Sequence, residues 1–120
     1  MTHEPESLEQ GLLCDLAAIE REMRLEPAYH RHGHAARALA RADDLRIMLI
    51  VLKAGAHIRQ HQAQETAAIH LVSGQVRLRL ASRLVELQAG QLLVLGSGLP
   101  HDVTAERDSA FTLTLGWRGR

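Results

Sequence analysis

Residues 55–74, GAHIRQHQAQETAAIHLVSG, decide how the rest of this chain is interpreted. The first glycine of the stretch is followed six residues later by His61, and its last glycine comes directly before a run of alternating apolar residues. A second stretch, residues 90–101, reads GQLLVLGSGLPH and also ends in a histidine. Glycines that bound short apolar runs are typical of turns between strands. Two such units, each supplying a histidine, predict a small barrel with one shared pocket.

Around these units, the alternation of apolar and polar residues predicts β-strands. Residues 45–53, LRIMLIVLK, are apolar at nearly every position, which indicates a strand covered on both faces. In residues 75–80, Arg77 and Arg79 share one face and apolar side chains the other, so this strand has a solvated side. We expect further strands at residues 36–42, 67–72, 84–87, 91–95, 102–105 and 110–117, with a turn at 43–44 and a hairpin turn at 73–74. Many short strands separated by glycine predict an all-β sandwich or jelly-roll barrel.

The N-terminal part of the chain follows a helical period instead. Ser7 and Gln10 fit a capping box, which indicates that a helix begins there. Apolar residues then recur at steps of four, three and four along one stripe: Leu12, Leu16, Ile19 and Met23. Pro27 disfavours helical geometry at the residue before it, so this amphipathic helix is expected to end near residue 25. We therefore assign residues 1–35 to an N-terminal helix and linker, and residues 36–120 to the barrel.

Three histidines alternate in the linker, at His30, His32 and His34. An extended segment would place them on one side, a geometry that can chelate a metal. The run also contains Gly33, follows a proline and has no carboxylate or cysteine nearby. We therefore favour a mobile linker over a metal site.

Length and charge restrict the class of protein. At 120 residues the chain is long enough for one domain with its own core. Its formal net charge is zero and its pI is about 7.1, which argues against a nucleic-acid binder. Residues 1–26 hold seven acidic residues against Arg21 and Arg24. This acidic segment either lies across a basic face of the barrel or is solvated, and we favour the second arrangement.

The cysteine content and the N-terminus predict the compartment. Cys14 is the only cysteine, which excludes an intrachain disulfide and indicates a reducing environment. The first ten residues are acidic and polar, unlike a signal peptide, and no apolar run approaches the ~18 residues of a membrane span. We expect a cytoplasmic protein that binds neither membranes nor nucleic acid.

On these residues the chain resembles the cupin superfamily, and within it small single-domain bacterial cupins with an RmlC-like jelly roll. The first cupin motif, G-x5-H-x-H-x3,4-E-x6-G, is matched by Gly55, His61 and Gly74. The second, G-x5-P-x-G-x2-H-x3-N, is matched by Gly90, Gly98 and His101. The resemblance implies a double-stranded β-helix over about residues 45–117.

The resemblance implies only part of a metal site. In metal-binding cupins, two histidines and a glutamate of the first motif and one histidine of the second hold the ion. Here two of these positions keep histidine and two carry alanine: His61, His101, Ala63 and Ala67. Because a divalent ion needs three or four donors and alanine has none, the two histidines alone predict a degenerate site. Gly96 and Ala105 also stand where the family has proline and asparagine.

Other side chains could replace the missing donors. His57 and Glu65 share the odd parity of His61, so one continuous strand would project the three together, although residues 60–65 look like a loop. His70 is out of phase with its apolar neighbours, and Asp102 with His101, so both are expected on outward faces. A subunit interface is one environment that would suit His70.

Three functions fit this pattern. The first is a barrel that binds a small molecule in an aliphatic pocket, with His61 and His101 as its polar contacts and a degenerate metal site. The alternative is a metal-dependent cupin enzyme of the dioxygenase or isomerase type, with iron, manganese, nickel or zinc. The third is an interaction module that uses the N-terminal helix. We favour the first and leave catalysis open. We also expect a homodimer, because residues 45–53 need cover on two faces and cupin barrels commonly pair through sheet faces.

Overall fold

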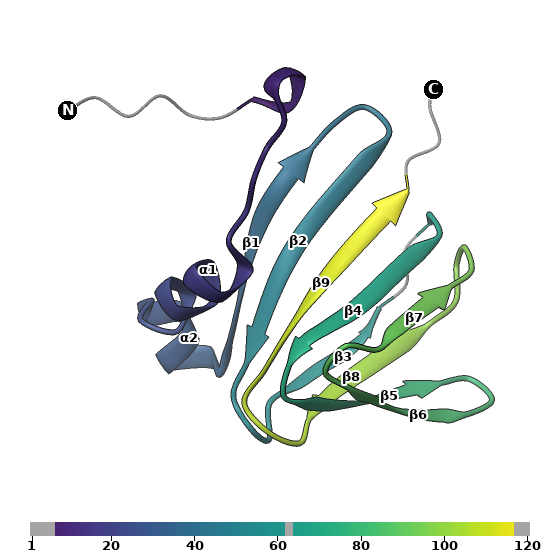
Figure 1. The fold of residues 1–120 in the computed structure, drawn as a ribbon. Helices are drawn as coiled ribbons and strands as arrows, with labels where there is room; N and C mark the ends of the chain where they lie inside the picture. Colours follow the sequence, from purple (N-terminus) through teal and green to yellow (C-terminus); the bar gives the residue numbers. More distant parts are fainter. Residues whose placement is uncertain (1–6, 62–63, 117–120) are drawn as a thin grey trace.

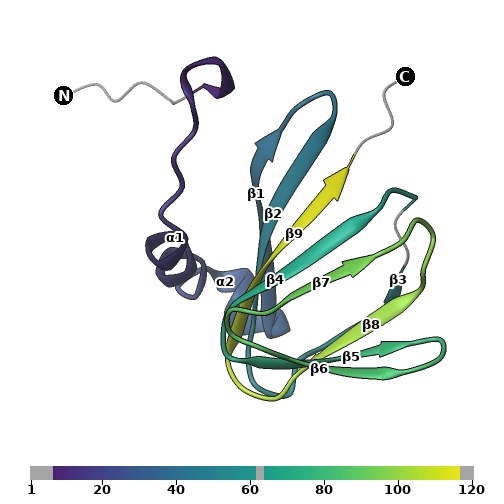
Figure 2. The same ribbon diagram turned by 45° about the vertical axis from the view of Figure 1, so that its right-hand side comes forward.

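The computed structural model describes residues 7–61 and 64–116, apart from the side chains of residues 60 and 61. Within these residues, nine strands form two antiparallel sheets that curve around one another into a barrel (Figures 1 and 2). The five-stranded sheet has the order β1 (His34–Arg41), β2 (Leu45–Leu52), β9 (Ser109–Gly116), β4 (Ala67–Ser73) and β7 (Leu92–Leu95). The four-stranded sheet has the order β3 (His57–His61), β8 (His101–Ala105), β5 (Gln75–Leu80) and β6 (Leu84–Gln88). The predicted all-β jelly roll is confirmed.

Aliphatic side chains from both sheets fill the barrel. Because successive side chains of a strand point to opposite faces, every second residue of a strand contributes. The buried members are Leu52, Ala67, Ile69, Leu71, Val76, Leu78, Leu87, Leu95, Val103, Ala105, Phe111, Leu113 and Leu115. Phe111, Leu113 and Leu115 share one face, as expected; Trp117, assigned to the same face, lies outside the described residues.

Strand β2 is covered on both faces over most of its length, as its sequence predicts. Ile50 and Leu52 pack in the barrel interior, whereas Leu49 and Val51 are fully buried under the N-terminal helices. The cover is incomplete at the start of the strand, where Leu45 is 37% exposed. One end of the outer face of the five-stranded sheet therefore lies beyond the helices.

The N-terminal helix begins later than the sequence suggests. Ser7 makes no side-chain capping bond, and only a short 3-10 turn, η1 (Leu8–Gln10), precedes an extended arm over residues 11–15. Helix α1 (Leu16–Met23) starts at Asp15, whose carboxylate accepts a hydrogen bond from the Ala18 amide at 3.1 Å. The prediction of a helix from Ser7 was wrong, because Asp15 makes the capping bond that Ser7 lacks. Cys14 consequently lies on the arm and not on a helix.

The expected histidine linker is instead a second helix, α2 (Pro27–His32). Pro27 occupies its first turn, where the fixed φ of proline suits a helix and no amide proton is needed. Gly33 ends the helix with a left-handed φ of 82°. The prediction of a mobile linker was wrong. That prediction placed Pro27 only at the end of the preceding helix, but this proline also stands in the first turn of a new one. Among the described residues, no helix is long and apolar enough to cross a membrane.

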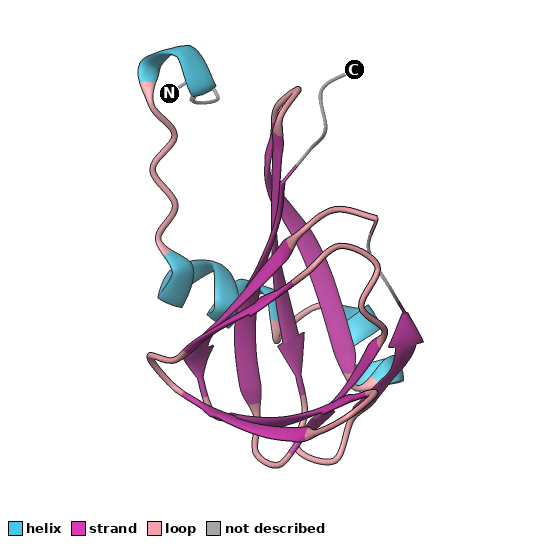
Figure 3. Cartoon of the chain, turned by 90° about the vertical axis from the view of Figure 1, so that its right-hand side faces the viewer, coloured by secondary structure: helices cyan, strands magenta, loops and turns pink. Residues whose placement is uncertain are grey.

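The two helices pack against the outer face of the five-stranded sheet (Figure 3). Met23 and Tyr29 are buried there against Leu49 and Val51. Glu22 and Glu26 also pair with Arg37 of β1, at 3.0 and 2.6 Å. Part of the acidic N-terminal segment thus lies against the barrel, contrary to the solvated arrangement that the sequence favoured.

The predicted hairpin at residues 73–74 was wrong. Strands β4 and β5 lie in different sheets, so Gly74 is a corner at which the chain passes from one sheet to the other. Its φ is 86°, and a Cβ atom there would overlap both the Asp108 carbonyl oxygen and Ser109 Oγ. Only glycine avoids both the left-handed strain and this contact.

Candidate functional site

His101 lies in the barrel interior at the first position of β8 and is 3% exposed. Its Nδ1 is 3.2 Å from the carbonyl oxygen of Leu99. A carbonyl can only accept, so this bond places the ring proton on Nδ1 and leaves a lone pair on Nε2 of the neutral imidazole. In this tautomer Nε2 is the ring atom that accepts a hydrogen bond or ligates a metal.

The backbone register places His61 directly opposite His101 across strands β3 and β8. A β-bulge produces this pairing: from Ile58 to His61 strand β3 advances three residues, while β8 advances two, from Val103 to His101. Without the bulge, Gln60 would stand opposite His101. Opposed positions on antiparallel strands lie ~4.5–5.5 Å apart at Cα. The two histidines predicted for the pocket thus occupy neighbouring positions.

The motif position that carries glutamate in metal-binding cupins is filled by a methyl group here. Ala67 is 2% exposed and belongs to the apolar core, with its Cα in register with Leu95 and Leu115. Ala105, at the asparagine position of the second motif, is likewise buried in that core. Ala63 lies outside the described residues.

The replacement donors considered from the sequence are not gathered around His101. His57 lies on the outer face of the four-stranded sheet, where its Nε2 is 3.2 Å from Asp102 Oδ2. The bulge in β3 removes the shared parity of His57 and His61 on which that hypothesis rested. Glu65 is half-buried in the turn before β4. Among the described residues, no group of three or more His, Cys, Asp or Glu side chains could hold a metal ion. The described residues therefore do not fit a tightly bound divalent ion.

The outward placement of two other residues agrees with expectation. Asp102 follows His101 and points to the opposite face, where it contacts His57. His70 is exposed on the outer face of the five-stranded sheet. The three linker histidines are also exposed, and two of them lie on helix α2, so the extended arrangement that could chelate a metal is absent from these described residues.

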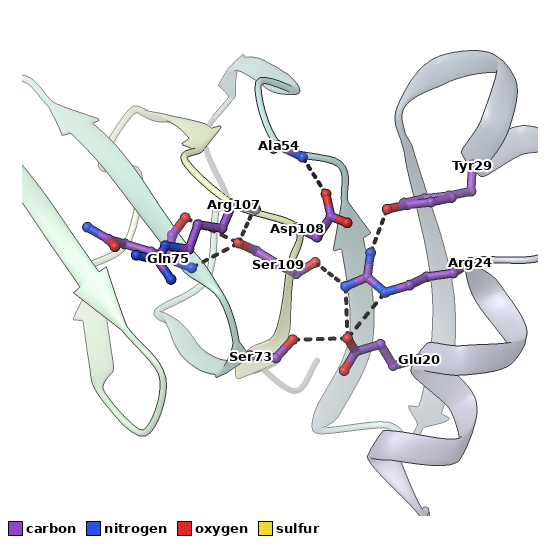
Figure 4. Close-up of polar contacts among 9 residues, drawn as sticks. All are labelled: Glu20, Arg24, Tyr29, Ala54, Ser73, Gln75, Arg107, Asp108 and Ser109. Atoms are coloured by element: carbon purple, nitrogen blue, oxygen red, sulfur yellow. Dashed lines mark hydrogen bonds and ion pairs between the residues drawn. The ribbon is translucent and has the colours of Figure 1, made fainter.

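Sequence reasoning missed a polar network that joins the helices to the barrel (Figure 4). Arg24 donates to Glu20 Oε2 at 2.8 Å, to the Tyr29 hydroxyl at 2.5 Å and to the Ser109 carbonyl at 3.2 Å. Ser73 donates to the same Glu20 carboxylate at 3.0 Å. The longest of these contacts joins residues 85 positions apart, so neither periodicity nor a local motif could have revealed it.

Tyr29 is the aromatic centre of this network. Burial raises the pKa of its hydroxyl above the ordinary value of 10.0, although the Arg24 guanidinium acts in the opposite direction. The Arg24 guanidinium carbon and Lys53 Nζ lie 5.4 and 5.5 Å from the centre of its ring. Cations at this distance from an aromatic ring are attracted to it and help to hold α2 on the sheet. The network stabilises the fold and lies outside the barrel interior.

A model of the cupin domain family matches residues 48–115, more than half of the chain. The chain belongs to the cupin family. The motif glycines and the two histidines from which the sequence predicted this family all lie within that match. No curated protein matches this cupin significantly.

Solved structures share the fold of this cupin. A conserved protein of unknown function from Streptococcus pyogenes superposes with a TM-score of 0.75 at 21% identity, covering 99% of this chain and 98% of that one. Salicylate 1,2-dioxygenase from Pseudoaminobacter salicylatoxidans gives 0.73 at 16% identity, covering 82% of this chain and 31% of that one. Oxalate decarboxylase from Bacillus subtilis gives 0.65 at 25% identity, covering 70% and 25%. The cupin therefore spans less than a third of either enzyme chain.

Proposed function

We propose that this cupin binds a small molecule in the aliphatic interior of its barrel, with His61 and His101 as the polar contacts, and that its metal site is degenerate. The observation that supports this most is the His101 ring, which is buried in the apolar core with its Nδ1 committed to the Leu99 carbonyl. Small-ligand sites typically combine an apolar lining with a few oriented polar groups.

The chemistry of the ring restricts the ligand class. Neutral His101 offers an acceptor to a hydroxyl or amine, and the protonated ring would bind a carboxylate. Ala67, at a neighbouring motif position, lies in register with Leu95 and Leu115 of the core, and such aliphatic neighbours favour a ligand with an apolar body. A small apolar alcohol or monocarboxylate has both features.

The alternative function is that of a metal-dependent cupin enzyme of the dioxygenase or isomerase type. Its support is the similarity in fold to a dioxygenase and a decarboxylase, together with the paired positions of His61 and His101. Iron, manganese, nickel or zinc would then have two imidazole donors and would act as a Lewis acid. The methyl group of Ala67 at the carboxylate position weighs against it.

A binding screen with a matched variant tests the first function. We expect some compounds in a panel of small alcohols and monocarboxylates to stabilise the wild type in thermal unfolding. His101→Ala should weaken their affinity, measured by calorimetry, at least about tenfold, which is the effect of losing ~1.4 kcal/mol of hydrogen bonding.

Asp102→Asn is the control, because Asp102 is the neighbouring residue but points to the outer face. It should leave the affinity unchanged. Compounds that bind the wild type and His101→Ala equally well would place the ligand site elsewhere and contradict the proposal.

A further inference from the structure

The oxygen atom that sets the tautomer of His101 belongs to the loop between β7 and β8. This loop consists of residues 96–100 (Figure 1). The Leu99 carbonyl oxygen in it accepts the hydrogen bond from His101 Nδ1, at 3.2 Å. The contacts that fix the path of the loop therefore also decide whether this acceptor faces the ring.

Hydrogen bonding within the loop gives it a shape but does not attach it to the barrel. The Leu99 amide donates to the Gly96 carbonyl at 3.3 Å, and Gly98 has a left-handed φ of 77°. Pro100 follows and has no amide proton to donate. The Leu99 side chain is half-buried and packs against the core. These features close a tight turn and anchor one side chain, but they leave the orientation of the backbone to other contacts.

Ser97 supplies such a contact. Its hydroxyl donates to the carbonyl oxygen of Gln64, in the turn before β4. The Thr66 carbonyl in the same turn accepts a hydrogen bond from the Gly116 amide, at the end of β9, at 3.1 Å. The Ser97 hydroxyl thus ties the β7–β8 loop, by way of this turn, to the five-stranded sheet.

This tie stands alone in the described part of the chain. Among the described residues, the Ser97–Gln64 bond is the one hydrogen bond that joins residues 96–100 to a segment other than the loop itself and β8. Ser97 is exposed, so water can replace Gln64 as the partner of its hydroxyl, and the bond adds little to global stability. Its effect is therefore on the position of the loop more than on the stability of the fold.

The ring and its acceptor differ in how freely they can move. His101 is 3% exposed and is held by the close-packed core around it. The Leu99 carbonyl lies on a loop whose neighbouring residue, Ser97, is at the surface. Hydrogen bonds weaken steeply as distance and angle depart from the ideal geometry. A small shift of the loop would break the bond, because the ring cannot follow it.

We propose that Ser97 is a positioning residue that sets the tautomer of His101. By holding the β7–β8 loop against the turn before β4, its hydroxyl keeps the Leu99 carbonyl opposite Nδ1. A neutral imidazole carries one ring proton, and the nitrogen that faces an acceptor keeps it. When the acceptor moves away, the proton leaves Nδ1 for solvent and another is taken up at Nε2, so the ring remains neutral.

The position of this proton decides which ligand group the ring can bind. With the proton on Nδ1, Nε2 accepts a hydrogen bond from a hydroxyl or an amine. With the proton on Nε2, the same atom donates to a carbonyl oxygen. A site built to bind a hydroxyl discriminates against an analogue that lacks it. If the proposed function holds, Ser97 therefore determines, through His101, a preference for an alcohol over the ketone of the same shape.

Nitrogen-15 NMR of protein labelled on the histidine rings tests the positioning role without any ligand. The His101 signals are those that disappear in His101→Ala, and at a pH where they report a neutral ring the wild type should carry its proton on Nδ1. Ser97→Ala should raise the ratio of the Nε2–H form to the Nδ1–H form at least ~threefold, an effect within reach of losing one hydrogen bond. Ser97→Thr keeps the hydroxyl and should restore the ratio of the wild type.

Ser82→Ala is the matched control, because Ser82 is also an exposed serine but lies in the turn between β5 and β6. It should leave the His101 signals unchanged. A Ser97→Ala ratio equal to that of the wild type, or a wild-type ring with its proton mainly on Nε2, would overturn the proposal. A change in ratio that comes only with a large fall in the urea midpoint would also overturn it, since that would reduce Ser97 to a structural role.

Calorimetry with cyclopentanol and cyclopentanone measures the consequence for specificity. The wild type should bind the alcohol more tightly, and Ser97→Ala should narrow the ratio of the two affinities at least ~threefold. A shifted tautomer with an unchanged affinity ratio would show that Ser97 does not determine specificity. If neither compound binds the wild type while the tautomer still shifts in Ser97→Ala, the result counts against the proposed function and supports the positioning role.

Discussion

His101 and Ala67 show how single residues separate two kinds of cupin chemistry. His101 keeps a buried imidazole whose tautomer is set by the Leu99 carbonyl. Ala67 places a methyl group in the core where metal-binding relatives carry a carboxylate. In the proposed function the first residue contacts the ligand, and the second lacks a donor atom that a divalent ion would need. Both identities can be read from the sequence by motif spacing.

The spacing of the motif residues did not predict the register of strands β3 and β8 that places His61 opposite His101. A regular strand would have placed Gln60 there, and the hypothesis that His57 and Glu65 act as donors depended on that regular strand. The bulge between Ile58 and His61 is a property of the β3–β8 pair and leaves no signal in either strand alone. The sequence could therefore identify the two histidines as candidates, but it could not predict the bulge that places them opposite each other.

Gly74 lies at the corner between the two sheets, and we expect its substitution by alanine to reduce the stability of the fold strongly. Gly74→Ala would impose a left-handed alanine and an overlap of its Cβ with the backbone at Asp108, so we expect about 3 kcal/mol or more of lost stability in urea unfolding. Gly90→Ala is the control, since Gly90 has a similar φ of 90° but nothing within 4 Å of the place that an alanine Cβ would take. It should cost only about 1–2 kcal/mol. Equal losses for the two variants would mean that the close approach at the corner does not constrain the fold.

At the scale of elements, the strands were predicted better than the N-terminal segment. Alternation identified most strands to within a residue or two, including β5 and β9, because half-buried strands repeat every two residues. It missed β3, which is short and ends next to residues outside the described part. The N-terminal stripe of Leu12 to Met23 suggested one helix, but Asp15 caps a shorter one and residues 11–15 are extended. Local capping decided the boundary that periodicity had placed too early.

Tyr29 is buried where α2 packs on the sheet, so we expect the stability of the fold to fall at alkaline pH as this tyrosine ionises. The folded pKa of Tyr29 is raised above 10.0, so the folded state binds the phenolic proton more tightly than the unfolded state. This contribution to stability is fully present below the unfolded pKa and is lost as pH rises through the folded pKa. Tyr29 is the only tyrosine, so the ultraviolet absorbance of tyrosinate reports its titration directly.

We expect the absorbance midpoint of the folded protein to lie above that of the protein in urea, with the unfolding free energy falling above about pH 10. A folded midpoint at or below the midpoint in urea would show that Tyr29 is not buried against the sheet as described.

At the scale of the whole molecule, the cupin keeps a barrel whose interior is aliphatic and whose two outer faces differ. One outer face carries ion pairs, and the other is covered in part by the two helices. The fold class and the family followed from glycine spacing and alternation. The helical cover and the corner at Gly74 depend on contacts between distant residues, which a single sequence does not display. The proposed degeneracy of the metal site is the property that most separates the small-molecule binding function from the metal-dependent alternative.

The metal content of the protein tests that property most directly. The protein would be produced without an affinity tag in medium supplemented with iron, manganese, nickel and zinc, and analysed by inductively coupled plasma mass spectrometry. We predict well below one ion per chain, with no significant difference between the wild type and the His61→Ala, His101→Ala double variant. One ion per chain in the wild type, lost in the double variant, would contradict the account and identify a metal centre in the barrel.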